Sequence, residues 1–279
     1  MINNFMRPYK LSLLFIACLI CATGMMLQAQ VDRKQIYNHG VIWGKVETTE
    51  IFEGKTWGIG GDVIHRRGSV LDGLNPLERG LRTSVRGWLH FQFGSDARVS
   101  VSPLSYHFTR AYAALESDLD IPNSFELRSS VQFFHHLRQR KGKLMHTWRY
   151  RLEFRNRSEV GKADFTSFFR LRLRYRFRYM LNAPDFYTPG VLYLASSVEL
   201  GLNMGAPVVY NTFNQNRIYA GIGYRFFNTA RIELRYLDRL RTRGSGYQFD
   251  RGRGVMLAVT IDQISYLGRR YTKPLRYAD

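Results

Sequence analysis

The chain has 279 residues and carries 41 basic against 22 acidic side chains, a formal net charge of +19 at pH 7. Eight of the basic residues are lysine and 33 are arginine. This length suits a single barrel or one to two ordinary domains, and the charge suits an anionic partner such as nucleic acid, anionic lipid or an anionic solute. Both cysteines, Cys18 and Cys21, lie in the first 29 residues, so the rest of the chain can form no disulfide.

The N-terminal segment has the three parts of a secretory signal peptide. Arg7 and Lys10 give a positive start, residues 11–22 are apolar, and Leu-Gln-Ala at 27–29 suits a signal peptidase. The alternatives are a retained membrane anchor, for which the apolar core is short, and a lipoprotein box at Cys18, which the apolar residues after it disfavour. We therefore expect a signal peptide at 1–29, a mature domain at 30–279, and no nucleic acid as a partner of this exported chain.

The mature chain alternates polar and apolar residues with a period of two, which predicts β-strands. The alternating segments are residues 55–65, 81–93, 98–108, 125–135, 148–155, 170–179, 192–204, 217–226, 230–236 and 255–261. No later run of about 18 apolar residues predicts a transmembrane helix. An exported membrane protein without such helices has one architecture left, the closed barrel. A soluble β-sandwich is the alternative, but its strands are usually shorter, about 5–6 residues.

Segment 170–179 indicates which face of the barrel wall points to the lumen and which points to lipid. Its even positions are Arg170, Arg172, Arg174, Arg176 and Arg178, and its odd positions are leucine, tyrosine and phenylalanine. An arginine that faces lipid near the middle of a membrane costs roughly 2–4 kcal/mol. Five would cost on the order of 10–20 kcal/mol, more than a typical total stability of about 5–15 kcal/mol. The arginines are therefore predicted to face the lumen.

The preceding strand should add to this charge. Its candidate lumenal residues are Arg149, Arg151, Arg155 and Arg157, and the predicted counter-charges are Glu126, Glu153, Glu199 and Glu233. One interpretation is a closed lumen packed with arginine–carboxylate pairs and water. The other is an anion-attracting wall that conducts or binds phosphates, sulfates or carboxylates, since guanidinium suits such groups.

The connections suggest the number of strands. Those at 94–97 and 227–229 are short, and those at 67–79, 110–124 and 238–252 are long and polar, as periplasmic turns and outer loops would be. Ten strands are evident between residues 55 and 264. Segment 41–48 also resembles a strand. Because both ends of the chain are expected on the periplasmic side, the number of strands must be even. If this segment spans, a partner strand has been missed and the total is twelve. The five arginines expected in the last loop could contact anionic lipid head groups.

Catalytic and metal motifs are weak in this sequence. The seven histidines form no spaced metal motif with cysteine or carboxylate. The glycines at 58–61 and 221–223 precede no predicted helix, so a nucleotide loop fails its structural requirement. A serine–histidine–acid site could use His90 or His107, but any chain of this size offers such residues. We predict no catalytic, cofactor-binding or metal residues and no cofactor, and we favour a non-enzymatic role.

Three segments resemble a known family. Residues 214–224, Asn-Gln-Asn-Arg-Ile-Tyr-Ala-Gly-Ile-Gly-Tyr, look like the signature of the domain-of-unknown-function 2490 family, and residues 149–155 and 170–176 are similar to its central Arg/Glu strands. The resemblance covers roughly residues 41–264. It implies an outer-membrane barrel of a Gram-negative cell, and it implies no activity and no catalytic residues. The chain ends without a terminal aromatic, so we expect its signal for the barrel-assembly machinery to be either internal, near Tyr266, or weak.

The prediction is an all-β, transmembrane, antiparallel up-and-down β-barrel of about 10–12 strands in the cell outer membrane, in contact with outer-membrane lipids. The first functional hypothesis is a basic-lumen pore or binding protein for small anions. The second is a structural barrel that maintains the envelope with a closed, salt-bridged lumen. The third is an outer-membrane lipid-modifying enzyme.

Overall fold

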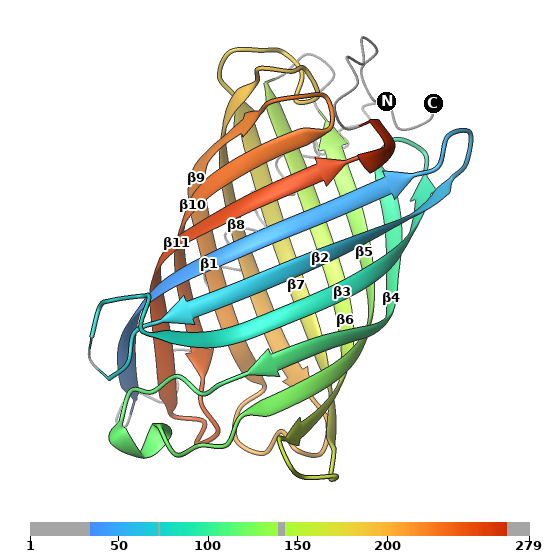
Figure 1. The fold of residues 1–279 in the computed structure, drawn as a ribbon. Coiled ribbons are helices and arrows are strands. Elements are labelled where there is room, and N and C mark those ends of the chain that lie inside the picture. The colour runs from blue at the N-terminus through green and yellow to red at the C-terminus, as the bar shows by residue number, and fades with distance from the viewer. Residues whose placement is uncertain (1–33, 72, 139–142, 267–279) are drawn as a thin grey trace, which may run out of the picture.

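Eleven β-strands make up most of the computed structural model, which describes residues 34–71, 73–138 and 143–266 (Figure 1). The strands are β1 (Gln35–Ile51), β2 (Trp57–Gly68), β3 (Arg79–Phe93), β4 (Ala97–Thr109), β5 (Ser124–Arg138), β6 (Leu144–Glu159), β7 (Thr166–Met180), β8 (Leu192–Met204), β9 (Phe213–Arg225), β10 (Ala230–Thr242) and β11 (Gln248–Asp262). Two short 3-10 helices, η2 (Glu116–Asp118) and η3 (Ile264–Tyr266), complete the described elements. No helix in these ranges is long and apolar enough to cross a membrane, a finding that does not bear on crossing by strands.

The strands form a closed barrel in which each pairs antiparallel with its sequence neighbours, except at one seam. There β1 runs parallel to β11, with Val41 beside Gly254 and Thr48 beside Ile261. Eleven strands lie within the predicted range, and segment 41–48 is indeed part of a strand. The parity argument for ten or twelve is wrong, because a parallel seam lets an odd number of strands close. As a result, β1 begins and β11 ends at opposite rims of the barrel.

The connections lie alternately at two rims (Figure 1). The lower rim carries the β2–β3, β4–β5, β6–β7, β8–β9 and β10–β11 connections, which include residues 69–78 and 110–123. The short connections at residues 94–96 and 226–229 lie at the upper rim. Two of the three predicted long loops therefore share one rim, as expected.

The third predicted loop, at residues 238–252, is mostly strand. β10 continues to Thr242 and β11 begins at Gln248. The charges that suggested a loop form a cross-strand pair on the outer face, where Arg251 donates to Asp238 at 2.6 Å. Alternating polar and charged residues near a rim can thus belong to a strand, because the outer face there need not be apolar.

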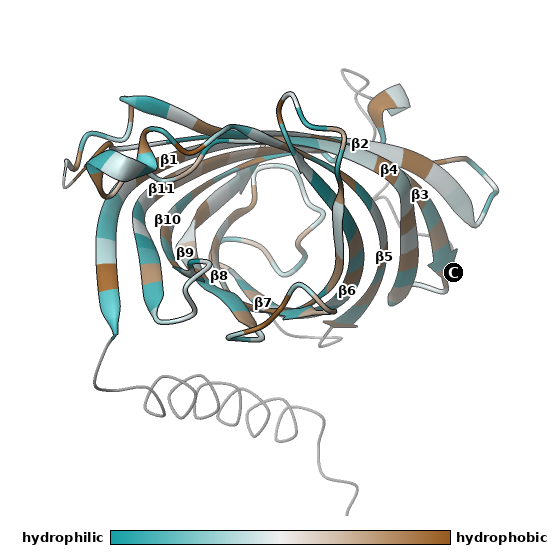
Figure 2. Ribbon diagram, turned by 90° about the horizontal axis from the view of Figure 1, so that it is seen from below, coloured by the Kyte–Doolittle hydropathy of each residue, from teal (hydrophilic) through white to brown (hydrophobic). Residues whose placement is uncertain are grey.

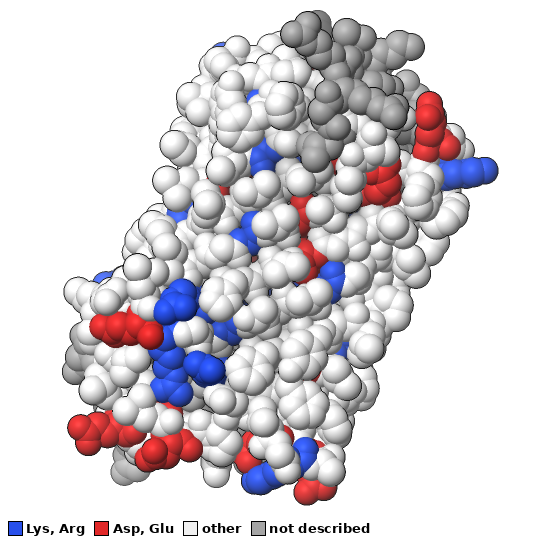
Figure 3. All heavy atoms as spheres, viewed as in Figure 1, with Lys and Arg blue, Asp and Glu red and all other residues white. Residues whose placement is uncertain are grey.

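The wall has two faces, as the alternation predicts. On β10 the outward Leu234 and Tyr236 are 51% and 50% exposed, whereas the inward Glu233 and Arg235 are 1% and 7% exposed. The outer surface is largely uncharged in Figure 3, with basic side chains gathered near the lower ends of β1, β2 and β11. Figure 2 looks into the barrel from below and shows the ring of strands around the lumen.

Two glycines are needed where other groups approach the wall closely. A Cβ on Gly254 would lie 1.7 Å from the carbonyl oxygen of Val41, across the parallel seam. A Cβ on Gly223 would lie 2.2 Å from the Tyr193 ring, which crosses the inner wall at that point. These glycines allow close packing under neighbouring groups.

Candidate functional site

The structure places the predicted arginines on the inner wall of the barrel. Arg149, Arg151, Arg155, Arg170, Arg172 and Arg178 are buried. Arg174 and Arg176 follow the same alternation on β7 and are half-buried. Arg157 is exposed because it lies close to the lower rim, where the lumen is wide.

β6 and β7 are neighbours, as expected, and their pairing places arginines opposite arginines. Arg149 lies opposite Arg174, and Arg151 lies opposite Arg172. Like charges that face each other across two strands destabilise the pair. Glu153 opposite Arg170 is the complementary position in this stretch. The hairpin therefore depends on acidic residues from other strands.

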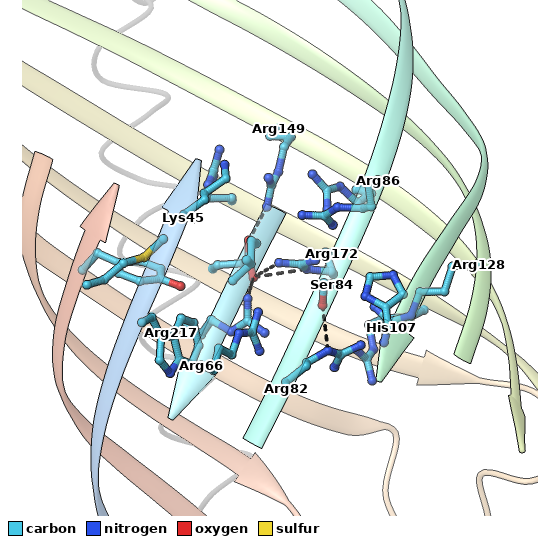
Figure 4. A pocket seen from close by; sticks show the side chains of 18 of the residues that line it. Lys45, Arg66, Arg82, Ser84, Arg86, His107, Arg128, Arg149, Arg172 and Arg217 are labelled. Atoms are coloured by element: carbon cyan, nitrogen blue, oxygen red, sulfur yellow. Dashed lines mark hydrogen bonds and ion pairs between the residues drawn. The ribbon is translucent and has the colours of Figure 1, made fainter. Parts of the chain in front are cut away.

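Two fully buried glutamates join these arginines along the inner wall. Glu199 on β8 accepts hydrogen bonds from Arg172 at 2.5 and 3.2 Å and from Arg217 at 3.0 Å, and it also pairs with Arg149 (Figure 4). Glu153 accepts from Arg172 at 2.8 Å. Arg172 thus bridges two carboxylates that come from β6 and β8, and charge-assisted bonds of this kind are the strongest class of side-chain hydrogen bond.

The other two predicted counter-charges, Glu126 and Glu233, are also buried. Glu126 pairs with Arg82, Arg128 and Arg155, and Glu233 pairs with Arg178, Arg231 and Arg235. Each of the four predicted carboxylates is therefore the centre of a cluster with at least three arginines. Such clusters satisfy buried charges that would be very costly alone.

Sequence reasoning missed further acidic residues of the lumen, among them Asp62 and Asp250. Asp62 on β2 accepts from the Arg86 guanidinium at 2.6 Å and from the Trp88 indole at 2.8 Å. The alternation of segment 55–65 could have identified Asp62, which lies on the face opposite Val63. Asp250 accepts from Arg241 at 2.6 Å. Asp250 was missed because its segment was predicted to be a loop.

Basic residues outnumber acidic ones in the interior. In the described ranges thirteen arginines but only eight acidic residues are buried. Arg66 packs on Trp43, and Arg239 hydrogen-bonds Gln215 and Tyr112; within those ranges neither forms an ion pair with an acidic side chain. The lumen therefore keeps an excess of positive charge that an anion would reduce.

Two connections fold into the ends of the lumen and cover part of the basic wall. At the upper rim, Phe186 from residues 181–191 is 4% exposed, and the guanidinium carbons of Arg178 and Arg225 lie 4.7 and 4.8 Å from its ring centroid. At the lower rim, the Tyr112 hydroxyl from residues 110–123 accepts from Arg239 at 3.0 Å. Cation–π contact lets an aromatic ring cover a guanidinium without a counter-charge.

The open space in the lumen is unevenly distributed. A cavity of about 50 Å³ lies among Arg66, Arg172 and Arg217 at mid-height (Figure 4). A far larger space of about 960 Å³, which we call the vestibule, opens at the lower rim. Its lining includes Arg155, Arg157, Arg170, Arg239, Arg241, Asn203, Asn214, Gln215, Tyr112, Phe168 and Tyr210. The mid-height cavity has room for a few waters at most, so the lumen is much narrower there than in the basic vestibule.

An ion pair at the lower rim fixes residues 110–123 against β10 and β11. Arg243 donates to Asp118 at 2.8 and 3.1 Å and to Asp250 at 2.7 Å. Burial raises the pKa of Asp118, but the hydrogen bonds from Arg243 and from the Leu115 and Ala114 amides outweigh it and hold that pKa below its ordinary value. The carboxylate is therefore ionised at neutral pH and holds the connection in place.

The two histidines considered for catalysis lie apart from the vestibule chemistry. His90 Nδ1 lies 2.8 Å from the Ser100 hydroxyl, and His107 Nε2 lies 3.0 Å from the Ser105 hydroxyl. No hydrogen bond joins either histidine to a carboxylate in the described ranges, so no serine–histidine–acid site is assembled there. The same ranges contain no group of three histidine, cysteine or acidic residues that could hold a metal ion.

A scan of protein families matches residues 41–250 to the family described as "Protein of unknown function (DUF2490)". Searches of curated proteins and of solved structures gave no match. The matched range extends from β1 into β11 and includes every strand of the arginine–carboxylate network. The match covers most of the chain, and the protein therefore belongs to the DUF2490 family.

Proposed function

We propose that this protein is an outer-membrane β-barrel that binds small anions in its basic vestibule and does not conduct them as an open pore. The observation that carries the proposal is the contrast between the vestibule of about 960 Å³ at the lower rim, lined by arginines, and the mid-height cavity of about 50 Å³ above it. A volume of several hundred Å³ with a few convergent polar groups is typical of ligand sites.

The outer face supports a membrane location. Val63, Val85, Leu152 and Leu257 are between 43% and 50% exposed on four different strands. Strands of 12 to 17 residues exceed the roughly 9–11 residues that a tilted membrane strand needs. An apolar outer face around a charged lumen is the pattern of membrane barrels, and water would be a poor solvent for so much exposed apolar surface.

The narrow middle of the lumen argues against free passage. The cavity there is about 50 Å³, Arg172 and its two glutamates lie along the inner wall on the adjacent strands β6 to β8, and Phe186 covers cations near the upper rim. A hydrated ion would have to displace several charge-assisted hydrogen bonds at once, which is costly in a site with little water.

The test uses the mature chain refolded in detergent and then in planar bilayers. We expect no steady conductance, and we expect inorganic phosphate to bind in calorimetry at low salt, more weakly as salt rises. Arg239→Gln should weaken phosphate binding, whereas Arg251→Gln, which alters an outward arginine, should not. A stable ohmic conductance would contradict the closed lumen, and equal binding by all three proteins would contradict the vestibule site.

The arginine–carboxylate network also favours a second candidate, a structural barrel that maintains the envelope. Clusters around four buried glutamates crosslink the six neighbouring strands β5 to β10, and also β3, through side chains alone. Absence of phosphate binding, combined with a high resistance to unfolding, would favour this structural role over the first proposal.

A further inference from the structure

Among the buried polar atoms without a partner on the inner wall of the vestibule, two belong to consecutive residues. They are Oδ1 of Asn214 and Nε2 of Gln215, and their residues are 8% and 1% exposed. Both residues line the vestibule. Buried polar atoms are nearly always hydrogen-bonded, so two neighbouring atoms without partners indicate a place where a ligand or water completes the wall.

A β-bulge turns Asn214 toward the vestibule. Leu202 on β8 pairs with Phe213, whereas the preceding Gly201 pairs with Gln215, so Asn214 is an extra residue on β9. A bulge redirects a side chain that regular alternation would send to the other face. The Asn214 and Gln215 side chains can therefore both reach the vestibule although they are consecutive in a strand.

The orientation of the Gln215 amide follows from its neighbours. Its Oε1 accepts from Arg217 at 2.9 Å and from Arg239 at 3.3 Å. Arginine has donors alone, so the oxygen of Gln215 must face these two residues and its nitrogen must face away. The wall thus offers one free acceptor, on Asn214, and one free donor, on Gln215.

Gly201 lies beside this pair and has no side chain. A Cβ on Gly201 would lie 3.1 Å from Gln215 Cγ, 3.6 Å from Gln215 Nε2 and 3.7 Å from Asn214 Oδ1. The glycine therefore leaves a small, tight niche next to both free atoms. A hydroxyl group can donate and accept at once, so a single hydroxyl in the niche could satisfy both amides.

The surroundings of the niche match a charged sugar better than a simple anion. Arg239 contacts Gln215 and has no acidic partner in the described ranges. Phe168 and the 70% exposed Tyr210 offer aromatic faces in the same vestibule. Inorganic phosphate would need the arginine alone, whereas amides, aromatic rings and a vestibule of about 960 Å³ suit a larger ligand with hydroxyl groups.

We infer that the vestibule binds a carbohydrate that carries a phosphate or carboxylate group, with a hydroxyl in the niche at Gly201 and the anionic group near Arg239. The inference rests on the proposed anion-binding function and adds the class of ligand. The residues that select the carbohydrate, Asn214 and Gly201, differ from those that supply charge.

Calorimetry with glucose 1-phosphate, glucose and inorganic phosphate tests the inference on the refolded mature chain. Because the niche adds two hydrogen bonds, we expect glucose 1-phosphate to bind at least about tenfold more tightly than phosphate. Asn214→Ala and Gly201→Ala should abolish this preference, so that each variant binds glucose 1-phosphate and phosphate with similar affinity. Asn156→Ala is the matched control, since Asn156 lies on the outer face and bonds the exposed Ser167.

The outcomes distinguish the carbohydrate inference from the proposed function. Equal affinity of the unaltered chain for phosphate and glucose 1-phosphate would overturn the carbohydrate inference and leave anion binding intact. Equal affinity for glucose and glucose 1-phosphate would overturn the role of the anionic group. Binding of none of the three would overturn both the inference and the proposed function, and this comparison needs no variant to fold.

Discussion

The guanidinium carbon of Arg66 lies 3.9 Å from the centroid of the Trp43 ring. Arg217 and Arg239 approach the same ring at 5.4 and 5.8 Å. Three cations thus surround one fully buried indole, and only Arg217 has an acidic partner among the described residues. Cation–π attraction reaches about 2 kcal/mol or more where water is excluded. Contact with the Trp43 ring therefore stabilises Arg66 and Arg239, which have no acidic partner among the described residues.

Replacement of Trp43 should therefore lower the free energy of unfolding by more than the loss of its side-chain volume alone would. We expect Trp43→Ala to lower the free energy of unfolding by about 3–5 kcal/mol or more, because a large buried ring is lost and Arg66 is left without a partner. Trp57→Ala is the control, since Trp57 is 46% exposed near the upper rim. Urea titration of the refolded barrel, followed by tryptophan fluorescence and by circular dichroism, measures the free energy of unfolding of both variants. Similar midpoints for the two variants would contradict this role of Trp43.

Glu199 should be the most sensitive acidic residue. Glu199→Gln removes the charge that Arg149, Arg172 and Arg217 share, and loss of one partner from a buried ion pair costs about 3–5 kcal/mol. Glu159→Gln provides the comparison, because its pair with Lys162 is exposed and such pairs contribute about 0–1 kcal/mol. If denaturant titrations give equal stabilities for the two variants, the network is not what holds β6 to β9 together.

Part of this network could be predicted from sequence for a simple energetic reason. An arginine such as Arg172 cannot face lipid, so the alternation of β7 assigns its face, and the same argument assigns Glu153 and Glu199. The partners of each arginine could not be predicted, because they depend on register between strands. A one-residue bulge at Asn214 shifts that register and adds a vestibule residue that alternation places outside.

The sequence predicts a closed barrel, but it does not predict that β1 and β11 close it in parallel. Alternation shows that a segment is a strand, but it does not show which edge the strand meets. The parallel seam depends on close backbone contact at Gly254 and Val41, and an isolated glycine in a strand can equally mark a bulge or a bend. The loops that fold inward were also not predictable, since Tyr112 and Phe186 lie in segments with no periodic pattern.

The ion pair between Arg243 and Asp118 at the lower rim leads to a prediction about how the docking of residues 110–123 depends on pH. The pKa of Asp118 is below its ordinary value of 3.8 in the folded chain, so its contribution to stability is fully present above that value and is lost as pH falls through the lower, folded-state pKa. Residues 110–123 should therefore stay docked from neutral pH down to about pH 4. Protection of the exposed Glu116 from a glutamate-specific protease should not vary across the protease's working range.

A variant separates this ion pair from other causes of protection. Asp118→Asn should increase cleavage at Glu116 at neutral pH, because Arg243 then loses its acidic partner in the connection. Asp120→Asn, two residues away and exposed, should leave the cleavage rate unchanged. Equal rates for the two variants would mean that Tyr112 and its neighbours hold the connection without Asp118.

The parallel seam predicts an unusual membrane topology. Because β1 and β11 run in the same direction, Gln35 and Ser265 lie at opposite rims and should lie on opposite sides of the membrane. Residues 30–279 contain no cysteine, so Gln35→Cys and Ser265→Cys each introduce a unique thiol. A maleimide that cannot cross the outer membrane should label one of the two in intact cells and both after lysis.

Two further variants serve as controls for the two rims. Lys55→Cys at the upper rim should behave like Ser265→Cys, and Gly244→Cys at the lower rim should behave like Gln35→Cys. Labelling of both Gln35→Cys and Ser265→Cys in intact cells would require an even number of spanning strands, and the seam between β1 and β11 would then be wrong.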